Sequence, residues 1–154
     1  MDMINKFKQW LLGEEQKTKE VVISVEQAIC VLMIEVMMSD LDTDERERER
    51  VFELLHKQYN VAKDDIQTLY FNALETKQNS HDVYQFTKRI RDQFDEQQRY
   101  DMIVALWHIA YSDGVIDPHE DFIIRRINDL LHLHHSHFVK AKLQAKQQAQ
   151  LNTK

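Results

Sequence analysis

The scarcity of glycine and proline is the feature that most constrains the fold of this chain. Its 154 residues contain two glycines, Gly13 and Gly114, and a single proline, Pro118. Tight turns between β-strands depend largely on glycine and proline, because these residues adopt backbone conformations that others rarely reach. Helices need neither residue in their interiors. The sequence therefore predicts an all-α fold.

Apolar residues recur at helical spacing along most of the chain. Residues 24–38 and 97–111 are apolar on nearly every side, which indicates two helices buried in the core. Ser80 is expected to cap the helix that follows it. The whole pattern predicts a compact bundle of about seven to eight helices, in segments 3–12, 24–38, 45–55, 61–73, 80–94, 97–111, 118–131 and 136–149.

The length of the chain suits one domain with a substantial apolar core. We expect this helical domain to span residues 23–150, preceded by an N-terminal amphipathic helix and linker in residues 1–22. Cys30 is the single cysteine and lies in an apolar run, so no disulfide can form within the chain. No stretch approaches the roughly 20 apolar residues that span a bilayer, and no secretory signal is recognisable. The sequence predicts a cytoplasmic protein.

The first expected helix, residues 3–12, is amphipathic and ends before Gly13. Residues 14–20 are polar and charged, as in a linker. Because Lys6 and Lys8 flank the apolar side, two interpretations stay open: this side packs on the bundle, or it touches a membrane surface peripherally. The apolar residues at helical spacing are Met3, Ile4, Phe7, Trp10 and Leu11.

The charge of the chain is −6, and it is unevenly distributed. The segment from Phe138 onward carries lysines and no acidic residue, so the acidic excess lies in the middle of the chain. Nucleic-acid binding depends on concentrated lysine and arginine, which an acidic middle does not offer. We therefore expect no nucleic-acid partner and consider a protein partner instead.

An acidic motif of the form D-x3-D-x2-E occurs twice, 73 residues apart. The first acidic motif is Asp40, Asp44 and Glu47, and the second acidic motif is Asp113, Asp117 and Glu120. An apolar helix precedes each motif, and each following helix reaches the sequence Leu-Leu-His. Such self-similarity predicts two related halves that arose by duplication and pack around a pseudo-two-fold axis.

The acidic motifs have a structural and a functional interpretation. Asp117, Pro118 and Glu120 have the order of an N-cap, a first-turn proline and a capping-box glutamate. Capping leaves Asp40 and Asp113 unexplained, because a negative charge at the end of a helix opposes its dipole. Clustered carboxylates also suit Ca²⁺ or Mg²⁺, although neither motif has the glycine of an EF-hand loop. The residues alone leave capping and a divalent-cation site as alternatives.

The stretch Ala110 to Glu120 resembles the signature of the TerB-like tellurite-resistance family. The resemblance extends over roughly residues 23–142. It implies an all-helical bundle linked to tellurite and other stress responses, with a metal-ion role at the acidic positions. The first motif departs from the family pattern, because Leu41 stands where the second motif has Gly114.

Other groups of reactive residues have ordinary structural interpretations. Histidines cluster in one connection, but no cysteine lies near them, so a polar loop is an alternative to a zinc site. Ser39 and Ser112 stand outside any nucleophile elbow, and a chain with two glycines has no phosphate-binding loop. We therefore expect no enzyme. The clustered histidines are His132, His134, His135 and His137.

Three hypotheses for the function follow from these patterns. The first is a non-enzymatic, stress-linked interaction domain with a divalent-cation site, calcium or magnesium, at the duplicated acidic motifs. The second is a metal-free adaptor that binds another protein. The third is a small hydrolase, because paired carboxylates can perform acid–base chemistry.

Overall fold

The computed structural model describes residues 23–39, 45–80, 82–114 and 116–152. Within these ranges the chain forms seven α-helices and one short 3-10 helix, and no strand. The all-α prediction is confirmed. The expected helix at residues 3–12 lies outside the described residues. The elements are α2 (Val25–Ser39), α3 (Glu45–Lys57), α4 (Lys63–Gln78), α5 (Tyr84–Gln93), α6 (Glu96–Ala110), η1 (Tyr111–Asp113), α7 (Pro118–Leu130) and α8 (His135–Asn152).

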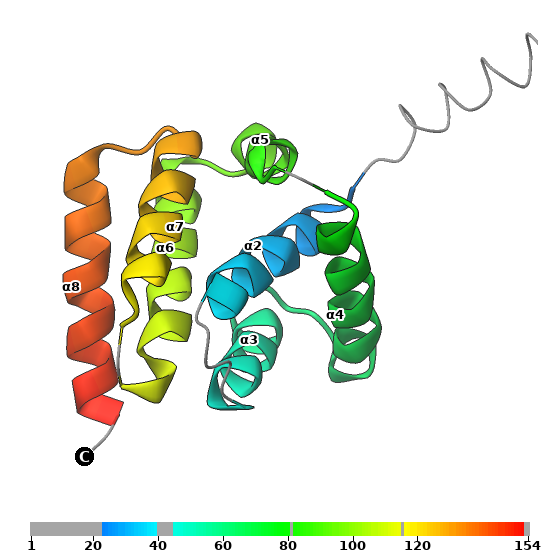
Figure 1. The fold of residues 1–154 in the computed structure, drawn as a ribbon, viewed down its shortest axis with the longest axis horizontal. Coiled ribbons are helices and arrows are strands. Elements are labelled where there is room, and N and C mark those ends of the chain that lie inside the picture. Colours follow the sequence, from blue (N-terminus) through cyan, green and yellow to red (C-terminus); the bar gives the residue numbers. More distant parts are fainter. Residues whose placement is uncertain (1–22, 40–44, 81, 115, 153–154) are drawn as a thin grey trace, which may run out of the picture.

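Helices α2 and α6 form the centre of the bundle. Nine of the fifteen residues in each are buried, around most of the helix circumference. Helix α2 contacts α3, α4, α5, α6 and α7, and α6 contacts α3, α7, α8 and η1 (Figure 1). The prediction of two core helices is confirmed. No helix in the described part of the chain has both the length and the apolar character that crossing a membrane requires.

The outer helices each bury one apolar stripe against this centre. Helix α3 buries Val51 and Leu55, while most of its N-terminal charge run faces solvent. Helix α8 buries Phe138, Ala141 and Ala145 against the α6 side of the bundle. Figure 1 shows α8 at one edge of the molecule and α4 at the other. Surface features on these two edges are therefore separated by the core.

The start of α5 differs from the sequence-based expectation. The backbone N–H of Ser80 donates to the carbonyl oxygen of Lys77 at 3.1 Å, so Ser80 belongs to the end of α4. The backbone N–H of Tyr84 donates instead to Oδ1 of Asp82 at 3.1 Å. The prediction that Ser80 caps this helix was wrong, because Asp82 lies closer to the first turn and has a stronger acceptor.

Helices α3 and α7 end in a similar way. Asn60 and His132 have φ angles of 60° and 58°, the left-handed conformation that commonly ends a helix. After α7, the N–H of Leu133 donates to the carbonyl oxygen of Asn128 at 3.1 Å. The buried side chain of Asn128 donates to the carbonyl oxygens of Leu133 and His134. These bonds fix the turn that sends α8 back along α6.

Candidate functional site

The second acidic motif forms the N-terminus of α7. Oδ1 of Asp117 accepts from the backbone N–H of His119 at 2.8 Å, and Oε1 of Glu120 accepts from the N–H of Asp117 at 2.9 Å. Pro118 occupies the first turn, where its missing N–H costs nothing. The predicted capping box is confirmed, so two carboxylates of this motif have a structural role.

Asp113 stands in the turn before this helix. It is the last residue of η1, and Gly114 follows in the left-handed conformation with φ of 83°. A Cβ atom at Gly114 would meet nothing within 4 Å, so the backbone angle, not lack of space, favours glycine here. The N–H of Gly114 donates to the carbonyl oxygen of Tyr111 at 3.0 Å. The half-buried side chain of Asp113 thus extends from a sharp turn.

Each motif contains a glutamate that is fully buried. Glu47 and Glu120 are both 0% exposed, an unusual position for a residue type that normally stays in water. Glu47 is the third residue of α3, and α3 packs against η1. The helix that carries Glu47 therefore contacts the turn that carries Asp113. Asp40 and Asp44 lie outside the described residues.

Metal-ligating residues are not gathered in the described part of the chain. No three histidine, cysteine, aspartate or glutamate side chains in residues 23–39, 45–80, 82–114 and 116–152 stand as a group that could hold a metal ion. This holds for the three carboxylates of the second acidic motif, which the structure places along one turn and helix start.

Three of the four clustered histidines contact residues outside the cluster, and the rings of His134 and His137 lie 6.2 Å apart. The Nε2 atom of His132 lies 2.6 Å from Nη1 of Arg91, and the Nε2 atom of His137 lies 3.2 Å from Oε1 of Glu96. The ring of His135 stacks on Phe138 with centroids 5.5 Å apart. These contacts agree with a polar connection between α7 and α8 and give no support to a zinc site.

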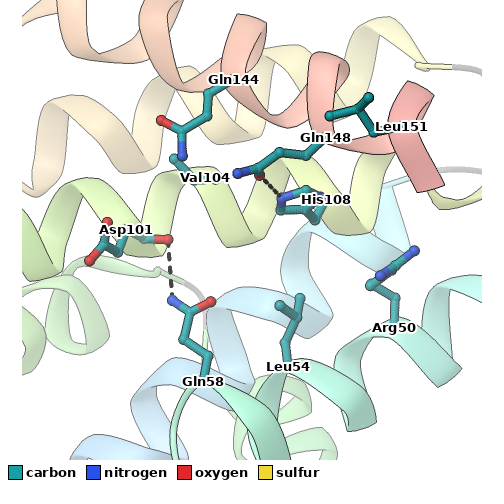
Figure 2. Close-up of a pocket in the computed structure, with 9 residues that line it drawn as sticks. All are labelled: Arg50, Leu54, Gln58, Asp101, Val104, His108, Gln144, Gln148 and Leu151. Atoms are coloured by element: carbon teal, nitrogen blue, oxygen red, sulfur yellow. Dashed lines mark hydrogen bonds between the residues drawn. The ribbon is translucent and has the colours of Figure 1, made fainter.

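A groove of about 520 Å³ lies between α3, α6 and α8 (Figure 2). The side of α3 and its C-terminal end form one wall, α6 forms the floor and α8 forms the other wall. Its residues recur every three or four positions on each helix, so each helix presents one stripe. The lining consists of Arg50, Leu54, Gln58, Asp101, Val104, His108, Gln144, Gln148 and Leu151. Sequence analysis missed this groove, because its three stripes are far apart in the chain.

His108 lies on the floor of this groove and is hydrogen-bonded to the wall that α8 forms. Its Nε2 atom is 2.6 Å from Oε1 of Gln148 (Figure 2), so a neutral ring with its proton on Nε2 donates to α8. Burial lowers the pKa of His108, the hydrogen bond that the ring donates to Gln148 opposes that shift, and the positive charge of Arg50 adds to the lowering. The neutral ring therefore links α6 to α8 near pH 7.

Cys30 is a free cysteine in the buried part of α2. It is 0% exposed, and burial raises the pKa of its thiol to about 12. A thiolate is the reactive form of cysteine, and this environment disfavours it. The interpretation of Cys30 as a core residue agrees with its position.

The N-cap of α7 generates a stability prediction. Asp117→Ala should lower the free energy of unfolding by about 1 kcal/mol, because the N–H of His119 loses its acceptor. Asp117→Asn should retain most of the stability, since asparagine is also a good N-cap. Urea denaturation of the three proteins measures both effects. An equal loss in the two variants would contradict the capping role.

The environment of His108 generates a pH prediction. The unfolded chain binds the proton with the ordinary pKa of 6.5 and the folded chain binds it more weakly, so protonation favours unfolding. The stability that neutral His108 contributes is fully present above pH 6.5, the pKa of the unfolded chain. It is lost as the pH falls toward the lowered pKa of the folded chain. Between about pH 7.5 and about pH 5.5, urea midpoints should therefore fall less for His108→Gln than for wild type. Equal falls would show that His108 contributes nothing.

Comparison with known proteins gives a family and no individual relative. The model of the family described as "Tellurite resistance protein TerB" matches residues 26–143, which is most of the chain. This range includes both acidic motifs, from Asp40 to Glu120. No curated protein matches the chain, and no solved structure does. On the family match and the helical fold together, this chain belongs to the TerB family.

Proposed function

We propose that this chain is a non-enzymatic, stress-linked interaction domain of the cytoplasm, related to tellurite resistance, whose acidic motifs hold a divalent cation. The family match supports the tellurite-resistance part of the proposal. The packing of α3 against η1 is the observation that supports the cation part, because it brings the helix that carries Glu47 against the turn that carries Asp113. A protein partner would then recognise a surface that the cation helps to shape.

Calcium or magnesium is the cation that this chemistry favours. Both are hard ions that prefer carboxylate and carbonyl oxygens, and a site between the motifs would draw on both oxygen types. The left-handed Gly114 bends the backbone sharply beside Asp113, which supports the second motif as the better half of the site. We propose Asp113, Asp117 and Glu120 as its ligands, with Asp40, Asp44 and Glu47 as the weaker set.

A metal-free adaptor is the second candidate, and the capping box favours it. Asp117 and Glu120 already bond to backbone N–H groups of their own helix, which gives both carboxylates a purpose without a metal. The groove between α3, α6 and α8 offers a surface for a protein partner in either case. Metal titration separates the two candidates.

Thermal denaturation with added Ca²⁺ or Mg²⁺ tests the cation proposal. An ion that binds only the folded chain adds about 2.7 kcal/mol of stability when its concentration is 100 times the Kd, so the Tm should rise. Asp113→Asn should abolish this gain, measured as the Tm of the variant with the ion minus its own metal-free Tm. Asp117→Asn should also reduce the gain, while keeping an N-cap.

The same titration can also contradict the cation proposal. If millimolar Ca²⁺ and Mg²⁺ leave the Tm of the wild-type chain unchanged, the cation proposal fails and the metal-free adaptor stands.

A further inference from the structure

The groove between α3, α6 and α8 has charges of opposite sign at its two ends. Gln58 donates to the backbone carbonyl oxygen of Asp101 at 3.4 Å, and this bond marks one end. Arg50 lies at the other end together with His108, whose ring is bonded to Gln148 (Figure 2). Among the described residues that line the groove, Asp101 and Arg50 are the two with a formal charge at pH 7. The groove is therefore electrically polar along its length.

Neighbouring charges modify the two ends of the groove without cancelling them. Glu53 pairs with Arg50 at 3.5 Å, a long ion pair between partly exposed groups, which contributes little. Glu53 itself lines the hollow between α3 and α4 and not the groove. Asp101 also borders a separate hollow lined by Glu96 and Lys140, whose charges are opposite in sign. A ligand in the groove therefore meets a positive charge at one end and a negative charge at the other.

Glutamine side chains on both walls offer hydrogen-bonding groups to the groove. Oε1 of Gln144 accepts from the hydroxyl of Tyr100 at 2.8 Å, and Oε1 of Gln148 accepts from His108. Figure 2 shows both amide nitrogens pointing into the groove, and neither donates to an atom of the part of the chain that the structure describes. On the opposite wall, Oε1 of Gln58 accepts from no donor within the same ranges. One wall thus supplies N–H donors and the other a carbonyl acceptor.

The middle of the groove is apolar, so its lining has three layers. Leu54 and Val104 form the middle layer, between Asp101 with Gln58 on one side and Arg50 on the other. Along the α3 wall, Leu54 stands four residues from each of its neighbours in the lining. Helical residues rise about 1.5 Å each, so successive layers lie about 6 Å apart and the outer two about 12 Å apart. The order along the groove is negative, apolar and positive.

We propose that the groove binds an extended segment of a partner protein that has a basic, an apolar and an acidic residue at alternate positions. Side chains on one face of an extended chain recur about every 6.6 Å, which matches the layers. The basic side chain meets Asp101 and the acidic one meets Arg50. The backbone N–H and C=O groups of an extended segment need partners, which the glutamine amides supply, whereas those of a helix are already bonded. This inference rests on the proposed interaction function and gives it a class of partner.

NMR titration of the full chain with two synthetic peptides tests the proposal. Both peptides have blocked ends, and their central sequences are Glu-Ser-Leu-Ser-Lys and the reverse, so both chain directions are offered. At millimolar concentration, at least one of them should shift the side-chain amide resonances of Gln144 and Gln148. A third and a fourth peptide, Glu-Leu-Ser-Ser-Lys and its reverse, should bind about tenfold more weakly than the first two, because their leucine no longer faces Leu54.

Two pairs of variants assign the binding to the groove. Arg50→Glu should weaken it about tenfold or more, because the acidic residue of the peptide then meets a like charge. Arg48→Glu is the matched control: it makes the same change on the same helix, at a side chain that is 47% exposed and does not line the groove, so it should retain binding. Gln148→Ala should weaken binding, and Gln147→Ala, at the exposed neighbouring residue, should not. The backbone amide spectrum identifies a variant that fails to fold, and Arg50→Gln then replaces Arg50→Glu.

Four results would overturn the proposal. Neither of the first two peptides could shift the amide resonances of Gln144 and Gln148, or the shifts could be confined to another surface of the domain. Arg50→Glu and Arg48→Glu could bind equally well, or the peptides with the displaced leucine could bind as tightly as the first two. The titration with Ca²⁺ or Mg²⁺ uses no peptide, and a partner could still bind another surface. The groove proposal can therefore fail while the proposed function stands, and the reverse.

Discussion

The burial of α2 and α6 is the constraint on which the rest of the structure depends. Both helices are apolar around most of their circumference, so each must be covered on several sides. Helices α4 and α5 cover α2, α8 covers α6, and α3 and α7 contact both. Each large side chain removed from water contributes about 1.5 to 3 kcal/mol. This burial fixes where the outer helices lie. The positions of the outer helices in turn determine where the second acidic motif, at the start of α7, and the groove between α3, α6 and α8 are found.

Local signals in the sequence predicted the parts of the structure that depend on local physics. The two core helices and the capping box at Asp117 follow from apolar spacing and from residues within one turn. The start of α5 was missed because Ser80 and Asp82 both offer an acceptor, and the end of α4 decides between them. The burial of Glu47 and Glu120 and the groove between α3, α6 and α8 were missed as well, since these features result from packing between distant segments.

If the proposed cation binds, the second acidic motif serves both helix capping and cation binding with the same residues. Capping occupies Asp117 and Glu120, and the left-handed Gly114 positions Asp113 at the turn against which α3 packs. A cation between the motifs would use carboxylates that already stabilise a helix end, so structure and binding would be coupled. The duplication of the halves stays a prediction. Two halves that arose by duplication would be expected to share local features, and α3 and α7 do end in similar left-handed residues, Asn60 and His132.

Hydrogen exchange of the backbone amides tests most directly whether α2 and α6 hold the domain together as one unit. Amides in a shared core exchange only when the whole domain unfolds, at the free energy measured by denaturation. The account predicts that the slowest amides of α2 and α6 exchange with the same free energy, above those at the ends of α3 and α8. Slow exchange in one of the two helices, with a clearly lower free energy in the other, would contradict a single core and indicate two separately unfolding halves.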